Sequence, residues 1–214
     1  MKRISLRFTN VMMLVALSVF WVGCDSGGSS GLSNKNPGNN DVNTVVAFGD
    51  SITAGSSCPC LSYPSRLGGM IDKRVINTGI PGSRVKEGVG RTQSVINRHH
   101  PAFFLILYGI NDVIHGGDPA MIINALSQMV AICRENNVVP VLATYPTMLW
   151  DHEVFAGTTY VLNAEIRTLA KAVGVRCVDL ELEFAANPAF YMPDGLHPND
   201  AGTQVMAMAF ADLF

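Results

Sequence analysis

The segment VVAFGDSITAG, from Val45 to Gly55, has the pattern of a buried strand that ends abruptly in a turn. Its first four residues are apolar without alternation, which is typical of a parallel strand covered on both faces, and Gly49 then ends the run. Ser51 follows two residues later. Its hydroxyl either caps a helix or is presented to a substrate, and this segment by itself supports both interpretations equally.

The rest of the chain continues this alternation of strand and helix. Apolar runs of strand length are separated by longer segments with helical features. Such alternation predicts an α/β fold with a parallel sheet and helices on both faces. The predicted strands are Thr44–Gly49, Arg74–Gly79, Ala102–Gly109, Val138–Tyr145 and Val175–Leu180. One predicted helix begins at Asp118 and Pro119, a second runs from about Thr159 to Val173, and a third runs from Ala201 to Leu213.

The loops that follow the strands are the candidates for a site, because ligands bind beyond the carboxyl ends of parallel strands. NTGIPGSR, after the second strand, contains Gly79 and Gly82, where the backbone can approach a ligand closely. YGINDVIHGG, after the third strand, contains Asn111, whose amide donates hydrogen bonds without carrying charge. Ordinary turns use the same residue types, so neither loop is specific alone.

The segment MPDGLHPND near the C-terminus is more specific. Asp194 and His197 stand three residues apart with a glycine between them, and a proline follows the histidine. In a turn of that size the carboxylate can reach Nδ1 of the imidazole, which leaves Nε2 as a base. Asp50, in contrast, is expected to hold its own loop together by accepting backbone hydrogen bonds rather than to take part in catalysis.

These pieces, in this order, resemble the SGNH hydrolases, also called the GDSL esterase/lipase family. FGDSIT corresponds to the nucleophile block, Gly79 to the glycine block, GIND to the asparagine block and DGLHP to the acid/base block. The resemblance extends from Thr44 to the end of the chain, and its one departure is Ile110, where a second glycine is common. It implies a flavodoxin-like, three-layer α/β/α fold with five parallel strands.

The resemblance also implies a role for each residue. Ser51 would be the nucleophile, His197 the general base and then acid, and Asp194 its orienting partner. The oxyanion hole would consist of the Ser51 N–H, the Gly79 N–H and the Asn111 side chain. The expected function is hydrolysis of carboxylic esters through an acyl-enzyme, of the lysophospholipase or carboxylesterase type, with no metal or other cofactor. Alternatives are a carbohydrate O-deacetylase, a non-catalytic envelope lipoprotein, and a flavodoxin-type cofactor binder.

Two features near the predicted site remain open. The loop YPTMLWDHEVFAGTTY is expected to lie over the site, where Met148, Leu149 and Trp150 would contact an acyl chain; alternatively it folds back on the core. Cys58 and Cys60 lie just after the Ser51 loop, and either a disulfide between them or two free thiols is compatible with so short a spacing.

The first residues have the pattern of an export signal. Three basic residues precede an apolar run from Val11 to Gly23, which is too short to span a bilayer at about 20 residues. Because Gly23 directly precedes Cys24, the segment resembles a bacterial lipoprotein precursor, with a plain signal peptide as the alternative. The resemblance implies a lipidated Cys24 that anchors an exported, periplasm-facing protein to a membrane of the cell envelope.

Composition sets the remaining limits. The 214 residues suffice for one well-packed domain, and 48% are hydrophobic. Beyond residue 23 there remain 12 basic and 17 acidic residues, a net charge of −5 that argues against a nucleic-acid partner. The predicted organisation is a signal peptide over residues 1–23, a flexible Gly/Ser/Asn-rich tether over 24–43, and a hydrolase domain over 44–214.

Overall fold

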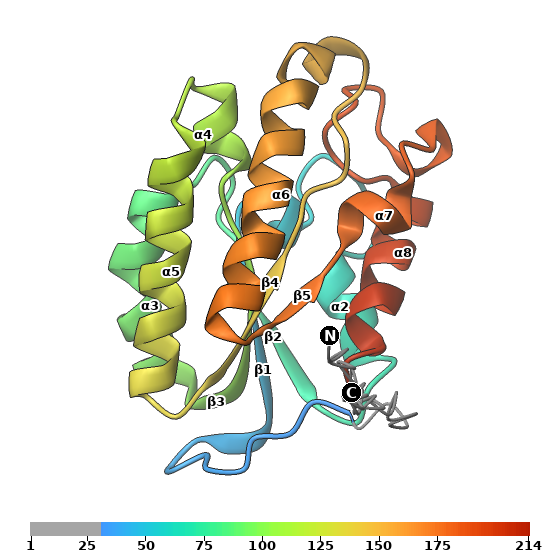
Figure 1. The fold of residues 1–214 in the computed structure, drawn as a ribbon. Helices are drawn as coiled ribbons and strands as arrows, with labels where there is room; N and C mark the ends of the chain where they lie inside the picture. Colours follow the sequence, from blue (N-terminus) through green and yellow to red (C-terminus); the bar gives the residue numbers. More distant parts are fainter. Residues whose placement is uncertain (1–30) are drawn as a thin grey trace, which may run out of the picture. The chain divides into compact units, whose positions relative to one another are not determined.

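The computed structural model describes residues 31–214, whose strands form one parallel sheet (Figure 1). The strand order is β2-β1-β3-β4-β5, so the chain starts near the middle of the sheet and builds outward in both directions. This confirms the predicted α/β fold with five parallel strands. The strands are β1 Asp41–Gly49, β2 Arg74–Asn77, β3 Pro101–Leu107, β4 Val139–Ala143 and β5 Arg176–Val178.

Helices cover both faces of the sheet. In Figure 1, α3, α5 and α6 pack side by side on one face, and α2 and α8 pack together on the other. The helices are α1 Ser51–Ala54, α2 Tyr63–Gly68, α3 Val85–His99, α4 Ile110–Ile114, α5 Pro119–Glu135, α6 Ala156–Val173, α7 Leu180–Phe184 and α8 Asp200–Ala211. Two 3₁₀ helices, η1 Trp150–Phe155 and η2 Pro188–Phe190, lie in the loops before α6 and α8. No described helix is both long enough and apolar enough to cross a membrane.

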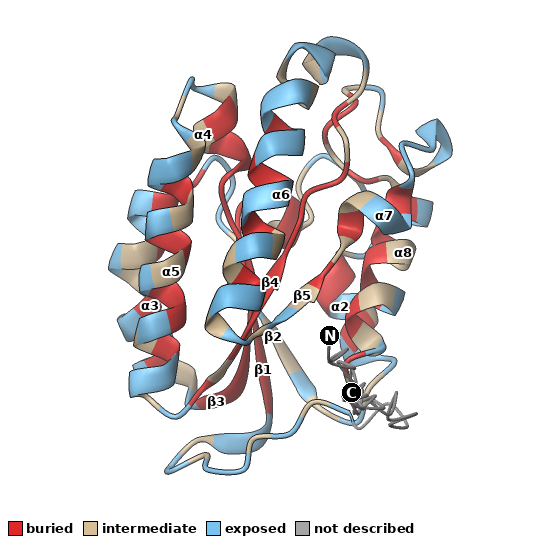
Figure 2. Ribbon diagram, viewed as in Figure 1, coloured by how far each residue is buried: buried red, intermediate tan, exposed pale blue. Residues whose placement is uncertain are grey.

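The core lies on both sides of β1 and β3. Every residue of β3 is buried, and so is β1 from Thr44 onward. Figure 2 shows that the buried residues of the helices lie on the sides that face the sheet. Phe48 of β1 and Phe104 of β3 have ring centroids 4.8 Å apart. Burial on both faces explains why these strands are continuously apolar in sequence.

The predicted helix signals operate as expected. Asp118 caps α5 by accepting a hydrogen bond from the Ala120 N–H at 3.0 Å, and Pro119 occupies the first turn. Gly174 ends α6 with a φ of 63°, a left-handed conformation that favours glycine. The helix begins at Ala156, three residues before the predicted start, because η1 leads directly into it.

The folded part extends further toward the N-terminus than predicted. Strand β1 begins at Asp41, and residues 31–40, predicted to be part of a flexible tether, lie against the domain. The Asn34 side chain donates to the backbone carbonyls of Ala102 and Asn137, at 3.2 and 2.7 Å. Asparagine side chains thus dock a segment that has almost no apolar surface to bury. The predicted signal peptide and Cys24 lie outside the described residues.

Candidate active site

Ser51 is the first residue of α1, directly beyond the carboxyl end of β1. The helix cap is Asp50, which accepts a hydrogen bond from the Ile52 N–H at 2.9 Å. The Ser51 hydroxyl does not cap this helix, so the helix-cap interpretation of this serine does not hold. Gly55 ends α1 with a φ of 81°, which turns the chain away after a single helical turn.

Asp50 anchors this loop in the core, as expected. Its side chain is fully buried, and its Oδ2 accepts a hydrogen bond from the Tyr145 hydroxyl at 2.7 Å. Burial raises the pKa of Asp50 to about 6, although the hydrogen bonds from Tyr145 and the Ile52 N–H and the charge of His197 oppose that rise. The carboxyl group thus connects the end of β1 to the end of β4 beneath the serine.

His197 comes to the serine from the other end of the chain. Its Nε2 lies 2.9 Å from the Ser51 Oγ, and its Nδ1 lies 2.6 Å from Oδ2 of Asp194. The fold therefore brings together three side chains of which two are separated by 146 positions. A hydroxyl, an imidazole and a carboxylate in this order form a chain that can move a proton off the hydroxyl.

The turn around Asp194 fixes the imidazole. Oδ1 of Asp194 accepts hydrogen bonds from the N–H groups of Leu196 and His197, at 2.9 and 3.0 Å. Burial alone would raise the pKa of Asp194, but these N–H groups and the His197 ring lower it below its usual value. Gly195, with a φ of 70°, lets the chain turn tightly enough for one carboxylate to make all three contacts.

Asn111 lies on α4, beyond the carboxyl end of β3. It is buried, and one N–H of its side-chain amide donates to the Ser83 carbonyl at 3.0 Å. The neighbouring Asp112 accepts a hydrogen bond from the Val85 N–H at 3.0 Å. These two bonds join the loop YGINDVIHGG to the segment that follows β2, from NTGIPGSR to the start of α3. They leave the second amide N–H of Asn111 available.

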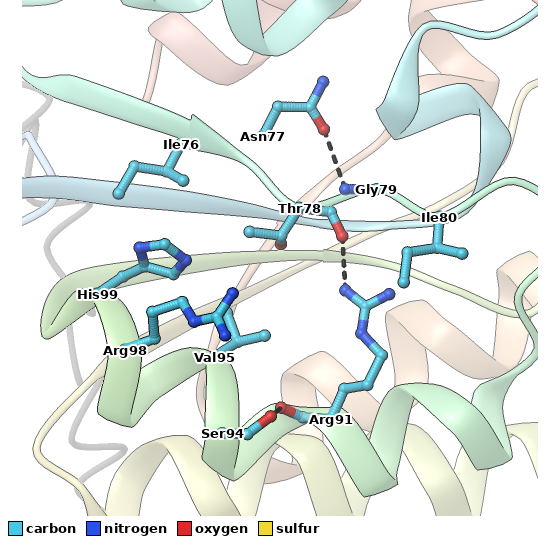
Figure 3. A pocket seen from close by; sticks show the side chains of 10 residues that line it. All are labelled: Ile76, Asn77, Thr78, Gly79, Ile80, Arg91, Ser94, Val95, Arg98 and His99. Atoms are coloured by element: carbon cyan, nitrogen blue, oxygen red, sulfur yellow. Dashed lines mark hydrogen bonds between the residues drawn. The ribbon is translucent and has the colours of Figure 1, made fainter.

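The two glycines of NTGIPGSR have different surroundings. The Gly79 N–H donates to the Asn77 side chain at 3.0 Å (Figure 3), and a Cβ at Gly79 would lie 2.3 Å from the Ala54 nitrogen. Gly79 therefore allows close packing beneath α1, and its amide is already bonded. Gly82 has a φ of 74° and open space around it, and its N–H makes no hydrogen bond within residues 31–214. The sequence could not distinguish the two glycines, since only the conformation separates them.

The loop after β4 lies beside the acid/base turn. The Leu149 N–H donates to the Gly195 carbonyl at 2.9 Å, and Nδ1 of His152 lies 2.7 Å from the Asp194 carbonyl oxygen. Trp150 is 47% exposed and contacts the Tyr191 ring edge to face. Met148 is only 1% exposed and belongs to the core. At this residue the loop therefore folds back on the core, which was the alternative to contact with an acyl chain.

Cys58 and Cys60 form a disulfide in the loop between α1 and α2. The bridge lies close to α8, since the Cys60 sulfur is 3.9 Å from the Thr203 hydroxyl. Cys133 is a buried free thiol, and Cys177 is a half-buried one. Within residues 31–214, no group of three or more His, Cys, Asp or Glu side chains is arranged to hold a metal ion.

Comparison with known proteins places the chain in a family. Residues 47–205 match the GDSL-like lipase/acylhydrolase family, which is more than half of the chain. An arylesterase of Vibrio mimicus is 29% identical over 163 residues, which cover 72% of this chain and 79% of the relative. Thioesterase 1/protease 1/lysophospholipase L1 of Escherichia coli K12 is 26% identical over 164 residues, covering 74% and 76%.

Solved structures agree with this assignment at the level of the fold. The crystal structure of a member of the lipolytic protein G-D-S-L family from Veillonella parvula superposes with a TM-score of 0.71 at 18% identity. The match covers 80% of this chain and 97% of that protein. With the family match over residues 47–205, these findings show that the chain belongs to the GDSL-like lipase/acylhydrolase family and is an ester hydrolase.

Proposed function

We propose that the protein is a serine esterase that hydrolyses carboxylic esters through an acyl-enzyme on Ser51. The observation that carries this proposal is the continuous chain from the Ser51 Oγ to His197 Nε2 at 2.9 Å and from His197 Nδ1 to Asp194 at 2.6 Å. A serine hydroxyl is a weak nucleophile at neutral pH and becomes reactive only beside a base. The lowered pKa of Asp194 favours the anion that orients and stabilises the protonated imidazole.

The reaction then proceeds in two halves. The Ser51 Oγ bonds to the ester carbonyl carbon while His197 Nε2 takes the hydroxyl proton, which gives a tetrahedral oxyanion. When this intermediate collapses, the bond to the alcohol breaks and His197 returns the proton to the departing oxygen. Water next attacks the acyl-enzyme with His197 again as base, and the carboxylic acid leaves as Ser51 regains its proton.

The oxyanion requires donors that are already in place. The Ser51 N–H, in the first turn of α1, has no acceptor within its helix, and Asn111 has one amide N–H that is not bonded to Ser83. We assign the third donor to Gly82 rather than to Gly79, because the Gly79 N–H is bonded to Asn77 and the Gly82 N–H is not bonded. Gly82 directly precedes Ser83, whose carbonyl holds Asn111, and this supports placing both donors on one side of the serine.

For the substrate we propose a small carboxylic ester or a lysophospholipid. Two relatives that match over most of their length are an arylesterase and a thioesterase 1/protease 1/lysophospholipase L1, which supports this class. A surface hollow of about 540 Å³ beside Gly82, with Ile80 and Pro81 in its wall, offers room for an acyl group. Leu149 and Trp150 would bound the substrate on the opposite loop. The predicted lipid anchor at Cys24 would hold the enzyme at an envelope membrane.

The test combines covalent labelling with an ester panel. A fluorophosphonate should label the wild-type protein and Ser56→Ala, which removes a neighbouring hydroxyl of the same loop, but not Ser51→Ala. Hydrolysis of p-nitrophenyl esters by Ser51→Ala should fall by at least about 10⁴-fold. Near-normal turnover by Ser51→Ala would refute the proposal. A panel of p-nitrophenyl esters from acetyl to dodecanoyl, lysophosphatidylcholine and acetylated xylo-oligosaccharides separates esterase or lysophospholipase activity from sugar deacetylation.

A further inference from the structure

A second cavity lies away from the serine, at the β2 edge of the sheet. It has a volume of about 420 Å³, is open to solvent, and lies between β2 with its continuation on one side and α3 on the other (Figure 3). Ile76, Thr78 and Ile80 line it from alternate positions of the strand and its continuation. Arg91 and Arg98 line it from two turns apart on α3, and both reach from the helix toward the strand in Figure 3.

The charge in this cavity is one-sided. Arg91, Arg98 and His99 are part of its lining, and no Asp or Glu is. Elsewhere in residues 31–214, Arg66 is paired with Asp200, and Arg167 is paired with Asp179 and Glu181. Neither Arg91 nor Arg98 forms an ion pair in that part of the chain. The cavity is therefore a concentration of positive charge on a domain that is acidic as a whole.

Arg91 shows that this charge is incompletely satisfied. Its Nη2 donates to the Thr78 carbonyl at 2.5 Å, and the guanidinium lies 4.7 Å from the centre of the Phe48 ring. Its Nη1 is buried and has no hydrogen-bond partner, which is true of no other buried side-chain nitrogen or oxygen in the described part of the chain. A buried, charged donor without an acceptor is costly, so an acceptor with negative charge would stabilise this arrangement.

His99 gives a second sign of the local potential. Burial lowers the pKa of His99, and the positive charges of Arg98 and of Arg74 on β2 lower it further. No carboxylate opposes this shift. An anion beside Arg98 would act in the opposite direction and favour the protonated ring, so the imidazole becomes a third source of positive charge once the anion has bound.

We propose that this cavity is a binding site for a phosphate group, carried by a small phosphate ester or by a phospholipid headgroup, with Arg91 and Arg98 as its principal ligands. Guanidinium groups bind phosphate oxygens in pairs, and two of them match the charge of phosphate better than that of a carboxylate. The apolar walls from Ile76 and Val95 accommodate the ester carbon atoms. Ile80 and Arg91 also line the hollow beside Gly82, so the two sites adjoin, but no lining residue belongs to the proposed catalytic group and phosphate binding can be measured without ester hydrolysis.

The direct test measures phosphate binding by the full-length protein. The melting temperature and the heat of titration are recorded with inorganic phosphate and with glycerol 3-phosphate, at an ionic strength matched with sodium chloride. Saturable binding is expected, and Arg98→Gln, a change at an exposed position, should weaken it about tenfold. Lys86→Gln removes the same charge from an exposed position on the same helix, outside the cavity, and should leave binding unchanged.

Vesicles distinguish the two sources of phosphate. Co-sedimentation is compared for phosphatidylglycerol vesicles and phosphatidylcholine vesicles that contain no anionic lipid. Arg98-dependent binding of soluble phosphate alone identifies a small phosphate ester, and Arg98-dependent binding of either vesicle identifies a headgroup. The proposal is overturned if neither probe binds in an Arg98-dependent way, or if Arg98→Gln and Lys86→Gln weaken binding equally. The proposal is also overturned if Arg91→Gln lowers the melting temperature while the wild-type protein binds no phosphate. Arg91 would then serve only to hold the Thr78 carbonyl in place.

Discussion

The loop that carries Ser51 and the turn that carries Asp194 and His197 meet at one site, but different interactions hold them. The Ser51 loop is part of the core: Asp50 is fully buried against Tyr145, and the backbone of Gly79 packs directly beneath α1. The acid/base turn lies nearer the surface, and hydrogen bonds within a few residues define its shape.

This difference separates stability from reactivity. A change beneath Ser51 disturbs groups that the fold has buried, so it should affect the free energy of unfolding. A change in the acid/base turn disturbs a local network of hydrogen bonds around Asp194, so it should affect catalysis more than stability. The proposed nucleophile is thus positioned by the core, and the proposed base by its own turn and by the contact of Gly195 with Leu149.

The largest expected effect lies within the acid/base turn. His197→Ala should lower kcat by on the order of 10⁶, because the proton of Ser51 then has no acceptor. Asp194→Asn should lower kcat by about 10⁴. The amide keeps the turn, but it no longer orients the imidazole correctly or stabilises its protonated form. Both variants should melt within a few degrees of the wild type. An Asp194→Asn protein as impaired as His197→Ala, or one that is unfolded, would contradict the idea of a locally held base.

Two glycines test the comparison directly. In Gly79→Ala the new Cβ would lie 2.3 Å from the Ala54 nitrogen, and in Gly195→Ala it would lie 2.0 Å from the Leu149 carbonyl oxygen. Because the first contact is with the buried Ser51 loop, Gly79→Ala should lower the free energy of unfolding by about 2–3 kcal/mol. Gly195→Ala meets backbone and also places alanine at a φ of 70°, so it should lower stability at least as much, and it should lower kcat of the folded protein by about 10²-fold, since it displaces the turn of His197. Urea unfolding and ester kinetics on both variants measure this; equal losses of kcat in the two folded variants would refute the distinction.

The last expected effect, which concerns stability and not catalysis, is a pH dependence at the base of the Ser51 loop. The pKa of Asp50 is about 6 in the fold against an ordinary value of 3.8, so between these values the folded protein holds a proton that the unfolded chain releases. Stability should therefore fall as the pH rises from about 4 to about 6, by on the order of 3 kcal/mol at most. Asp50→Asn should remove this contribution, and Tyr145→Phe should extend it to higher pH. Parallel stability curves for wild type and Asp50→Asn in this range would show that burial does not raise this pKa.

Much of this architecture follows from sequence patterns alone. The unbroken apolar runs around Phe48 and Phe104 predict central parallel strands, because only strands covered on both faces need apolar residues at every position. Asp118 and Gly174 mark helix ends through local hydrogen bonding and backbone conformation. The turn from Asp194 to His197 is predictable for the same reason, since its contacts join residues at most three apart.

Other features required the tertiary structure, because they depend on which surfaces meet. The choice between Gly79 and Gly82 as a free amide rests on packing against α1 and on the Asn77 side chain. Met148 is as apolar as a ligand-contacting residue would be, but it points into the core. The docking of residues 31–40 through Asn34 also has no signature in composition, because it depends on carbonyl groups about 70 and 100 positions away.

The chain by itself determined the α/β order and the identity of the chemical groups, since periodicity, caps and turns act over a few residues. Only the folded structure decided that the Ser51 Oγ and the His197 ring lie within hydrogen-bond distance, and that two arginines of α3 face a cavity without a carboxylate. The physical reason is the distance along the chain over which each interaction acts. Caps and turns depend on residues a few positions apart, whereas contacts between distant segments arise from the packing of the whole sheet and its helices.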